Sequence, residues 1–365
     1  MVNWDSGLFK FTPVWGLTFL TTVNIVIYID RSVVGVSITQ TVVHDLTSYK
    51  HGMGLSYQEA GALGSIFMLG YALSSPILAV SAQYIHPLFL MGTGLFVWSG
   101  ATMMAGLSVD YPMLLIARIF TGVGEASFVC LAPPYIIDVA PPAKRTVSFT
   151  QMWLGIFYSA MIIGAALGFG YGTIVSQALG SWRWPFIIES LAMLPFILTC
   201  LVAYKDPVFR PKKLGGDDSE KANLWTQVKQ LFNLRIFMLI SLGYGGYAFT
   251  VGGLTFWAPD YQESFYGVNA TTASLVLGGI TVIAGFSGTM VGSVFTDRRL
   301  RPLQKSRDEG EISELEMLRI RTERTTGIMW LTLGAAASVA LVGAIIPVYA
   351  VYLISLAISE FCIFL

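Results

Sequence analysis

Charged residues are scarce in this sequence. Asp, Glu, Lys and Arg together make up 12% of its 365 residues, about half of the roughly 25% found in an average soluble domain. Apolar residues make up 54% of the chain, and the mean hydropathy is +0.65. Because a chain with so few charges cannot cover its surface in water, we expect its solvent to be lipid. The sequence predicts an all-α polytopic membrane protein.

Several patterns that carry chemistry are also missing. The three cysteines, Cys130, Cys200 and Cys362, lie in apolar runs without metal-ligand spacing, so we expect neither a disulfide framework nor a metal site. There is no Gly-x-x-x-x-Gly-Lys loop for the phosphates of ATP, and we expect no cofactor. The 22 basic residues balance the 22 acidic ones, which argues against nucleic acid binding. No nucleophile and base stand in a pattern that suggests an enzyme.

The apolar residues fall into about ten runs that are long enough to cross a bilayer. A spanning helix needs about 20 predominantly apolar residues. The predicted spans are residues 13–38, 57–82, 86–107, 111–138, 145–173, 183–204, 235–262, 270–295, 324–344 and 346–365. The last two follow closely on each other and reach the end of the sequence.

The charged segments divide these spans into two groups. We predict an amino-terminal six-helix bundle at 1–204, a cytoplasmic linker at 205–234, and an incomplete carboxy-terminal bundle of four spans at 235–365. Residues 297–323 form a charged cytoplasmic loop within that second bundle, part of which is compatible with a solvated helix. Most Lys and Arg residues then lie on the side of the amino terminus, which places this terminus in the cytoplasm. Plasma and lysosomal-type membranes are not distinguished by this rule.

Ionisable residues inside the predicted spans are candidates for a functional site, because burying each in lipid costs several kcal/mol. Asp30 and Arg31 lie near the outer end of the first span, and Arg118 and Glu125 lie in the fourth. A rise of ~1.5 Å per residue puts Asp30 and Arg118 at nearly the same depth in the membrane, so an ion pair between them is geometrically allowed. Glu125 follows Arg118 by seven residues and therefore lies on the same helix face, two turns deeper.

These charges allow two interpretations. In the first, a buried ion pair only holds the first and fourth spans together. In the second, Arg31 and Arg118 bind an anionic head group, while Asp30 or Glu125 carries a proton, because a buried carboxyl can gain and lose a proton near neutral pH. The sequence slightly favours the second interpretation.

Glycines and aromatic residues mark two other spans. The fifth contains glycines at four-residue spacing, Gly164, Gly168 and Gly172, a pattern that lets helix backbones approach closely. The expected role is packing, with a sliding surface as the alternative. The seventh contains Tyr244, Tyr247 and Trp257, which either face lipid or line a cavity for an acyl chain.

Several short motifs occur together in this chain. They are Tyr28-Ile29-Asp30-Arg31 in the first span, residues 55–61 and 67–71 in the second, Arg118 with 122–126 in the fourth, residues 256–259 in the seventh and Ser359-Glu360 in the tenth. Together they resemble the spinster-like branch of the major facilitator superfamily along essentially the whole chain. That resemblance implies two six-helix halves, of which the second lacks two spans here, with the substrate site near the midplane between them.

The resemblance implies a secondary transporter of lysolipids or sphingoid phosphates that works by proton-linked alternating access. Asp30, Arg31, Arg118 and Glu125 match the family's functional positions, and Glu360 matches its acid in the tenth span. The partners implied are a small lipid substrate, protons and membrane lipids, and a monomer is expected.

The superfamily's gating signature, a Gly followed by an Asp-Arg pair, is absent from residues 79–84. It is retained after the eighth span as Gly292, Asp297 and Arg298.

Other functions remain open at this point. A proton-coupled symporter of an organic anion or a sugar would use the same fold, because fold does not determine substrate. A receptor or channel fits less well, since ten spans do not match a seven-helix receptor and the intramembrane charges lie in one half. With two spans missing, we expect residues 1–365 to be a fragment that cannot transport by itself.

Overall fold

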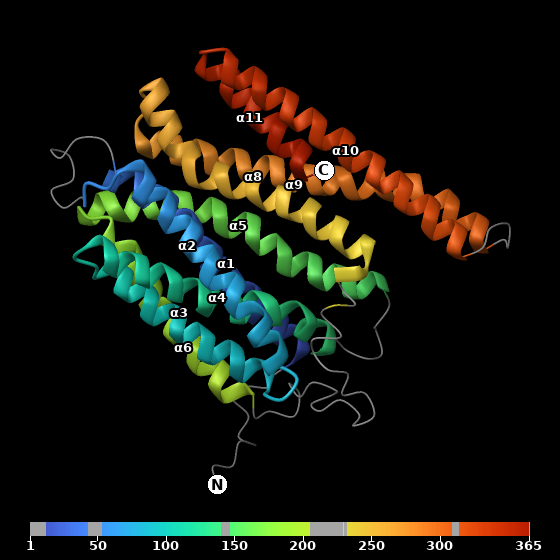
Figure 1. Ribbon diagram of the computed structural model, residues 1–365, viewed down its shortest axis with the longest axis horizontal. Helices are drawn as coiled ribbons and strands as arrows, with labels where there is room; N and C mark the ends of the chain where they lie inside the picture. The colour runs from blue at the N-terminus through green and yellow to red at the C-terminus, as the bar shows by residue number, and fades with distance from the viewer. Residues whose placement is uncertain are drawn as a thin grey trace, which may run out of the picture. The chain divides into compact units, whose positions relative to one another are not determined.

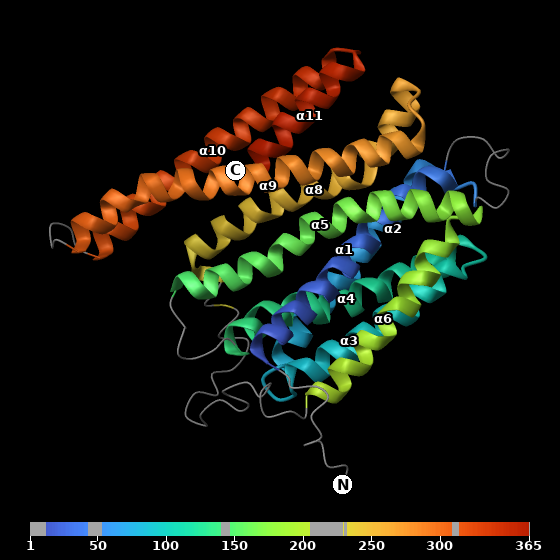
Figure 2. The same cartoon turned by 180° about the vertical axis from the view of Figure 1, so that it is seen from behind.

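The computed structural model describes residues 12–42, 53–139, 147–204, 229, 232–308 and 314–364. Helices form all the regular secondary structure in these ranges (Figures 1 and 2). They are α1 (Pro13–Val42), α2 (Tyr57–Ser81), α3 (Pro87–Gly106), α4 (Tyr111–Val139), α5 (Val147–Leu179), α6 (Arg183–Ala203), α8 (Arg235–Tyr266), α9 (Ala270–Asp308), α10 (Glu314–Ile345) and α11 (Tyr349–Phe364).

The predicted spans coincide with these ten helices, but the number that can cross a membrane differs. Eight helical segments in the described residues are long and apolar enough to span a bilayer. The apolar part of α10, Leu333–Gly343, and the helix α11 are shorter than a full crossing. The molecule is therefore an integral multi-pass membrane protein with eight candidate spans and two shorter apolar helices, rather than ten equivalent spans.

In the predicted cytoplasmic loop at 297–323, the helix from Glu314 agrees with the solvated helix that the sequence allowed, and only the extension of α9 differs from the expectation. Helix α9 continues as far as Asp308, and α10 already begins at Glu314, so nearly all of this loop is helical. Residues 309–313 lie outside the described part of the chain, as does most of the predicted linker at 205–234. The helices extend beyond the apolar residues because a helix satisfies its own backbone hydrogen bonds in water as well as in lipid.

The chain divides into two compact units. The first comprises Met1–Ser264 and Val268–Ser274, and the second comprises Phe265–Gly267 and Leu275–Leu365. In the second unit α10 and α11 pack along each other, and Gly343 lies against Ser355 of α11. The division falls later in the chain than the predicted linker, whose role as a boundary stays a prediction.

The helices α1 to α6 form a bundle in the first unit. Helix α1 packs along α5, α2 packs along α4, and α3 lies between α4 and α6. The side-by-side course of α3 and α6 can be followed in Figures 1 and 2. Large apolar side chains fill the interior, including the fully buried Ile27, Trp98 and Phe128.

Local sequence signals explain where several of these helices begin and end. Ser56 and Glu59 form a capping box at the start of α2, in which each side chain binds the other residue's backbone N–H. Pro87 occupies the first turn of α3, where its missing N–H costs nothing. Helix α5 stops at Leu179 because Gly180 adopts a φ of +68°, a conformation that glycine tolerates best.

The predicted glycine stripe of α5 is confirmed as a packing surface. A Cβ atom placed on Gly164 would lie 2.6 Å from the carbonyl oxygen of Ile25, and one on Gly168 would lie 2.5 Å from that of Ile29. Both oxygens belong to α1, so the two backbones are in direct contact along the stripe. A buried hydrogen bond of 3.2 Å from Asn24 Nδ2 to the carbonyl oxygen of Phe157 adds to this contact.

We expect Gly168→Ala to destabilise the bundle, while Gly155→Ala in the same helix does not. The new methyl group at Gly168 meets backbone that cannot move aside, and such overpacking costs about 1–3 kcal/mol. A Cβ on Gly155 meets nothing within 4 Å. The measurement is the thermal unfolding midpoint of each purified variant in detergent. Equal midpoints for the two variants would contradict the close contact between α1 and α5.

Candidate functional site

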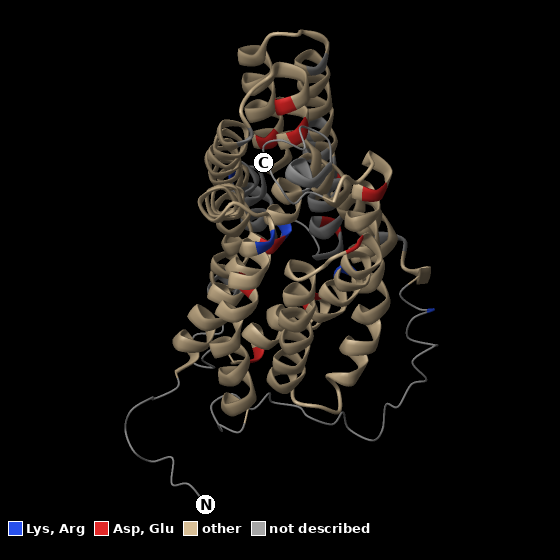
Figure 3. Cartoon of the chain, turned by 90° about the vertical axis from the view of Figure 1, so that its left-hand side faces the viewer, with Lys and Arg blue, Asp and Glu red and all other residues tan. Residues whose placement is uncertain are grey.

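Charged side chains are few along the helices, and most of the ribbon in Figure 3 carries none. Among the described residues of helices α1 to α6, four acidic and basic residues are nevertheless buried: Asp30, Arg118, Glu125 and Glu189. A group buried in this way needs an opposite charge or hydrogen bonds to offset its lost hydration. The arrangement of these residues defines the candidate site.

An ion pair joins α1 to α4. Arg118 Nη1 lies 3.2 Å from Asp30 Oδ2 and donates a hydrogen bond to it. The Asp30 side chain is fully buried and that of Arg118 is only 4% exposed. The pair that the helix rise allowed in the sequence is therefore formed in the structure. Asp30 Oδ1 and Arg118 Nε have no hydrogen-bond partner among the described residues.

A second ion pair joins the same two helices. Arg31 Nε donates a hydrogen bond of 2.7 Å to Glu125 Oε1, and Nη2 of the same guanidinium also contacts that oxygen. Glu125 is fully buried, whereas the Arg31 side chain is 25% exposed. The long side chain of Arg31 bridges the depth that separates it from Glu125, a contact that the sequence analysis did not predict.

Aromatic rings of α1 and α2 lie beneath both guanidinium groups. The Phe67 ring centroid is 5.0 Å from the Arg118 guanidinium carbon and 5.5 Å from that of Arg31. Tyr28 and Tyr71 also face Arg31, at 4.8 and 6.0 Å. Such contacts stabilise a partly dehydrated cation by about 0.5–2 kcal/mol each. The buried Phe67 ring therefore lies close to both guanidinium groups.

Close helix contacts position these side chains. On α2, Gly70 lies against the backbone of Ile119, and on α4, Gly122 lies against the backbone of Phe67. A side chain at either glycine would separate the two helices and lift Phe67 away from the arginines. On the other side of α1, the stripe of α5 contacts the residue before Asp30.

Glu189 of α6 is a member of this site that the sequence analysis missed. Its side chain is 3% exposed, and it interacts electrostatically with Asp30 and Arg118. Neither carboxyl oxygen has a hydrogen-bond partner in the described part of the chain. The sequence did contain a signal for it, because Glu189 is the one charged residue in the apolar run from Phe186 to Cys200.

A family comparison gives this geometry a context. The Major Facilitator Superfamily model matches residues 20–365. The chain belongs to the major facilitator superfamily. Charged pairs on α1 and α4 thus lie in the amino-terminal part of a protein from a superfamily of membrane transporters, which agrees with the expectation of a non-enzymatic protein.

Individual relatives carry spinster names. The "Probable sphingolipid transporter spinster homolog 1" of Arabidopsis thaliana is 33% identical over 323 residues, covering 79% of this chain and 64% of that protein. The "Sphingosine-1-phosphate transporter SPNS2" of Mus musculus is 26% identical over 284 residues, covering 74% of this chain and 49% of that protein. This major facilitator chain thus spans less than two thirds of the length of these relatives.

A solved structure shows the same fold. It is a bacterial homologue of the human lysosomal transporter Spinster in an inward-facing, unoccupied conformation. The TM-score is 0.67 at 20% sequence identity, with 96% of this chain and 73% of that chain covered. The expected major facilitator fold is confirmed by this likeness, which concerns the fold alone.

The remaining predicted site residues lie apart from the two ion pairs. In the second unit, Glu360 of α11 is 6% exposed and accepts a hydrogen bond of 3.4 Å from Thr281 Oγ1. On α8, Tyr244 is 63% exposed, and Trp257 packs beside Tyr57 at the start of α2, with ring centroids 6.1 Å apart. The side chain of Tyr247 lies outside the described residues.

The predicted gating residues are placed differently from the expectation. Gly292, Asp297 and Arg298 were expected in a turn after the eighth span, but all three lie within the continuous helix α9. Gly292 is buried and Arg298 is exposed, while the Asp297 side chain is not among those described. A role in gating stays a prediction.

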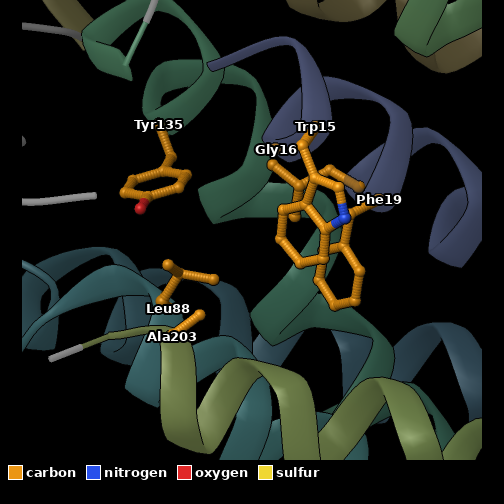
Figure 4. A pocket seen from close by; sticks show the side chains of 7 residues that line it. Trp15, Gly16, Phe19, Leu88, Tyr135 and Ala203 are labelled. Atoms are coloured by element: carbon orange, nitrogen blue, oxygen red, sulfur yellow. The ribbon is translucent and has the colours of Figure 1, made fainter. Parts of the chain in front are cut away.

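A small pocket in the first unit is separate from the charged site. Its lining residues come from the ends of four helices: Trp15, Gly16, Phe19 and Leu20 of α1, Leu88 of α3, Tyr135 of α4 and Ala203 of α6 (Figure 4). The cavity volume is about 10 Å³, far below the roughly 300 Å³ at which ligand pockets begin. Phe19 precedes Asp30 by eleven residues, or ~16 Å of helix. We therefore do not assign a ligand to it.

Removing one partner of the buried pair should destabilise the bundle more than removing both. Asp30→Asn or Arg118→Gln alone leaves an uncompensated buried charge, at a cost of about 3–5 kcal/mol. The double variant leaves none, so its thermal unfolding midpoint should exceed that of at least one single variant. Glu125→Gln serves as comparison and should cost less, because the Arg31 charge that it leaves unpaired is partly exposed. A double variant less stable than both single variants would show instead that the ion pair itself makes a net contribution to the stability of the bundle.

Proposed function

We propose that this member of the major facilitator superfamily is a secondary transporter for lipids with an anionic head group and an apolar chain, such as lysolipids or sphingoid phosphates. The observation that carries the proposal is the pair of arginines, Arg31 and Arg118, which both lie close to the Phe67 ring and are each paired with a carboxylate. Two adjacent guanidinium groups suit a phosphate, which accepts hydrogen bonds on several oxygens. The spinster relatives are named as sphingolipid and sphingosine-1-phosphate transporters, which supports this substrate class.

The head group is proposed to bind by replacing the carboxylates. Arg31 is the accessible partner, since a quarter of its side chain is exposed. An anion that takes over the Arg31 guanidinium leaves the fully buried Glu125 without its cation. A buried carboxylate that has lost its cation takes up a proton, because the neutral acid is far cheaper to bury. Substrate and proton would therefore bind together, as proton-linked alternating access requires.

The other expected residues keep their proposed roles. Asp30 and Glu125 carry protons in the first unit, and Glu360 does so in the second. Tyr244, Tyr247 and Trp257 of α8 contact the apolar chain, and Gly292, Asp297 and Arg298 contribute to the cytoplasmic gate. We further propose a monomer with the amino terminus in the cytoplasm, in which residues 205–234 link the two halves.

Binding of the head group can be tested with Arg31→Gln, a variant that should fold because Arg31 is partly exposed. Losing a charge-assisted hydrogen bond costs about 1.5–3 kcal/mol, which corresponds to about 10- to 100-fold weaker binding of sphingosine phosphate. Binding of sphingosine, which lacks the phosphate, should change little. Affinities are measured on purified protein in detergent, with Lys229→Gln as the charge-removal control. Equal losses for both ligands would contradict a head-group role.

The same experiment separates the lipid from a polar organic anion, which two arginines would also accept. Shortening the acyl chain of the phosphorylated probe should weaken its binding to the unaltered protein. Affinity that is independent of chain length would favour an organic anion symporter on the same fold.

Glu125→Gln tests the coupling to protons. Transport driven by a proton gradient into proteoliposomes, measured on a version of the protein with two complete six-helix halves, should fall by at least about tenfold, because the amide cannot release a proton. Exchange of labelled for unlabelled substrate, which needs no net proton movement, should be largely retained. Glu316→Gln, which removes an acid from an exposed position on α10, is the matched control. Equal loss of driven transport and exchange would instead indicate a structural role for Glu125.

A further inference from the structure

Glu189 on α6 has no part in the function proposed above, yet its burial demands an explanation. Its side chain is 3% exposed, and both of its carboxyl oxygens are buried without a hydrogen-bond partner in the described ranges. The next residue, Ser190, is hydrogen-bonded to Ser99 of α3 and makes no hydrogen bond to the Glu189 carboxyl. An ionised carboxylate without hydrogen bonds is among the most costly groups to bury, whereas the neutral acid costs much less.

The charged and titratable groups that interact with Glu189 come from α1, α4 and α5. Asp30 of α1 and Arg118 of α4 interact with it electrostatically, and Tyr171 of α5 is also within electrostatic range. The Tyr171 hydroxyl donates a hydrogen bond of 3.0 Å to the carbonyl oxygen of Pro185. Helix α3, which has the most extensive contact with α6, contains no titratable residue between Pro87 and Gly106. Among these groups, Arg118 is the cation that could pair with an ionised Glu189.

The charges of the site balance only when Glu189 is neutral. Asp30 and Glu125 offset Arg118 and Arg31 in two ion pairs. An ionised Glu189 would add one negative charge that these pairs do not compensate. Arg118 Nε is a buried donor without a partner in the part of the chain that the structure describes, and an ionised Glu189 is the natural group to attract it. In the structure the two groups are not bonded to each other.

We propose that Glu189 is a protonation site that controls whether Arg118 is available to an anionic ligand. This inference rests on the proposed function, in which Arg118 takes part in head-group binding. With the proton bound, only Asp30 competes for Arg118, and an anion can approach. When the O–H bond breaks, the electron pair stays on the carboxyl oxygen and the proton leaves to water. The resulting carboxylate then competes for Arg118 and repels the anion.

The first test asks whether Glu189 holds a proton and requires no ligand. A protonated carboxyl has an infrared C=O band that is separate from the carboxylate bands and shifts in D₂O. The difference spectrum between the unaltered protein and Glu189→Gln at neutral pH should show this band lost in the variant. Glu316→Gln should retain it. The amide is isosteric with the neutral acid, so Glu189→Gln should fold. A variant that loses only carboxylate bands would overturn the protonation site.

The second test measures the binding of sphingosine phosphate from about pH 6 to about pH 9, the range in which buried glutamates can titrate. Affinity for the unaltered protein should fall by about tenfold or more as the pH rises, although the phosphate itself becomes more negative. Glu189→Gln should show a shallower fall in affinity, because only the proton uptake at Glu125 then remains, and Glu189→Asp should keep the full pH dependence. An unchanged profile in Glu189→Gln would overturn the control of Arg118.

The two tests distinguish this inference from the proposed function. If sphingosine phosphate binds to no variant while the infrared band is present, the proposed function fails and the control of ligand binding fails with it. If the probe binds but the band is absent, the proposed function stands and the role of Glu189 is wrong.

Discussion

The ion pair between Asp30 and Arg118 places the strictest geometric constraint on the bundle, because two charges in an apolar interior require close partners. Arg118 Nη1 and Asp30 Oδ2 are 3.2 Å apart, on helices that must be held at fixed depth and rotation. The glycine stripe of α5 fixes α1 by direct backbone contact. Gly70 and Gly122 bring α2 against α4 and place Phe67 under both arginines. Close packing at these glycines thus holds the helices where the buried charges can reach their partners.

The two ion pairs differ in access, and this difference gives the site its order of events. Asp30 and Arg118 are both buried, so their separation costs more than a local rearrangement. Arg31 reaches the exterior with a quarter of its side chain while Glu125 stays inside. In the proposed function, a ligand would therefore exchange with a carboxylate at Arg31 first. The deeper pair would respond only after the charge balance at Arg31 had changed.

Much of this site could be predicted from the sequence, and the failures have physical causes. The match in depth of Asp30 and Arg118 follows from the helix rise alone. The Arg31–Glu125 pair does not, because Cα positions omit the length of an arginine side chain. Glu189 could not be assigned in this way because no second charged residue stands near it in the apolar run from Phe186 to Cys200. The length of α9 was underestimated because hydropathy marks where lipid ends and not where a helix ends.

Electroneutrality connects the burial of these charges to the proposed transport. The paired residues of the first unit sum to zero charge, so an incoming anion makes the site negative unless a proton accompanies it. The carboxylate that the anion displaces binds that proton most favourably, since it has lost its cation in an apolar environment. Coupling between substrate and proton then needs no separate relay. It follows from having one carboxylate for each arginine, and Glu189 would add a site at which the pH sets the balance before any ligand arrives.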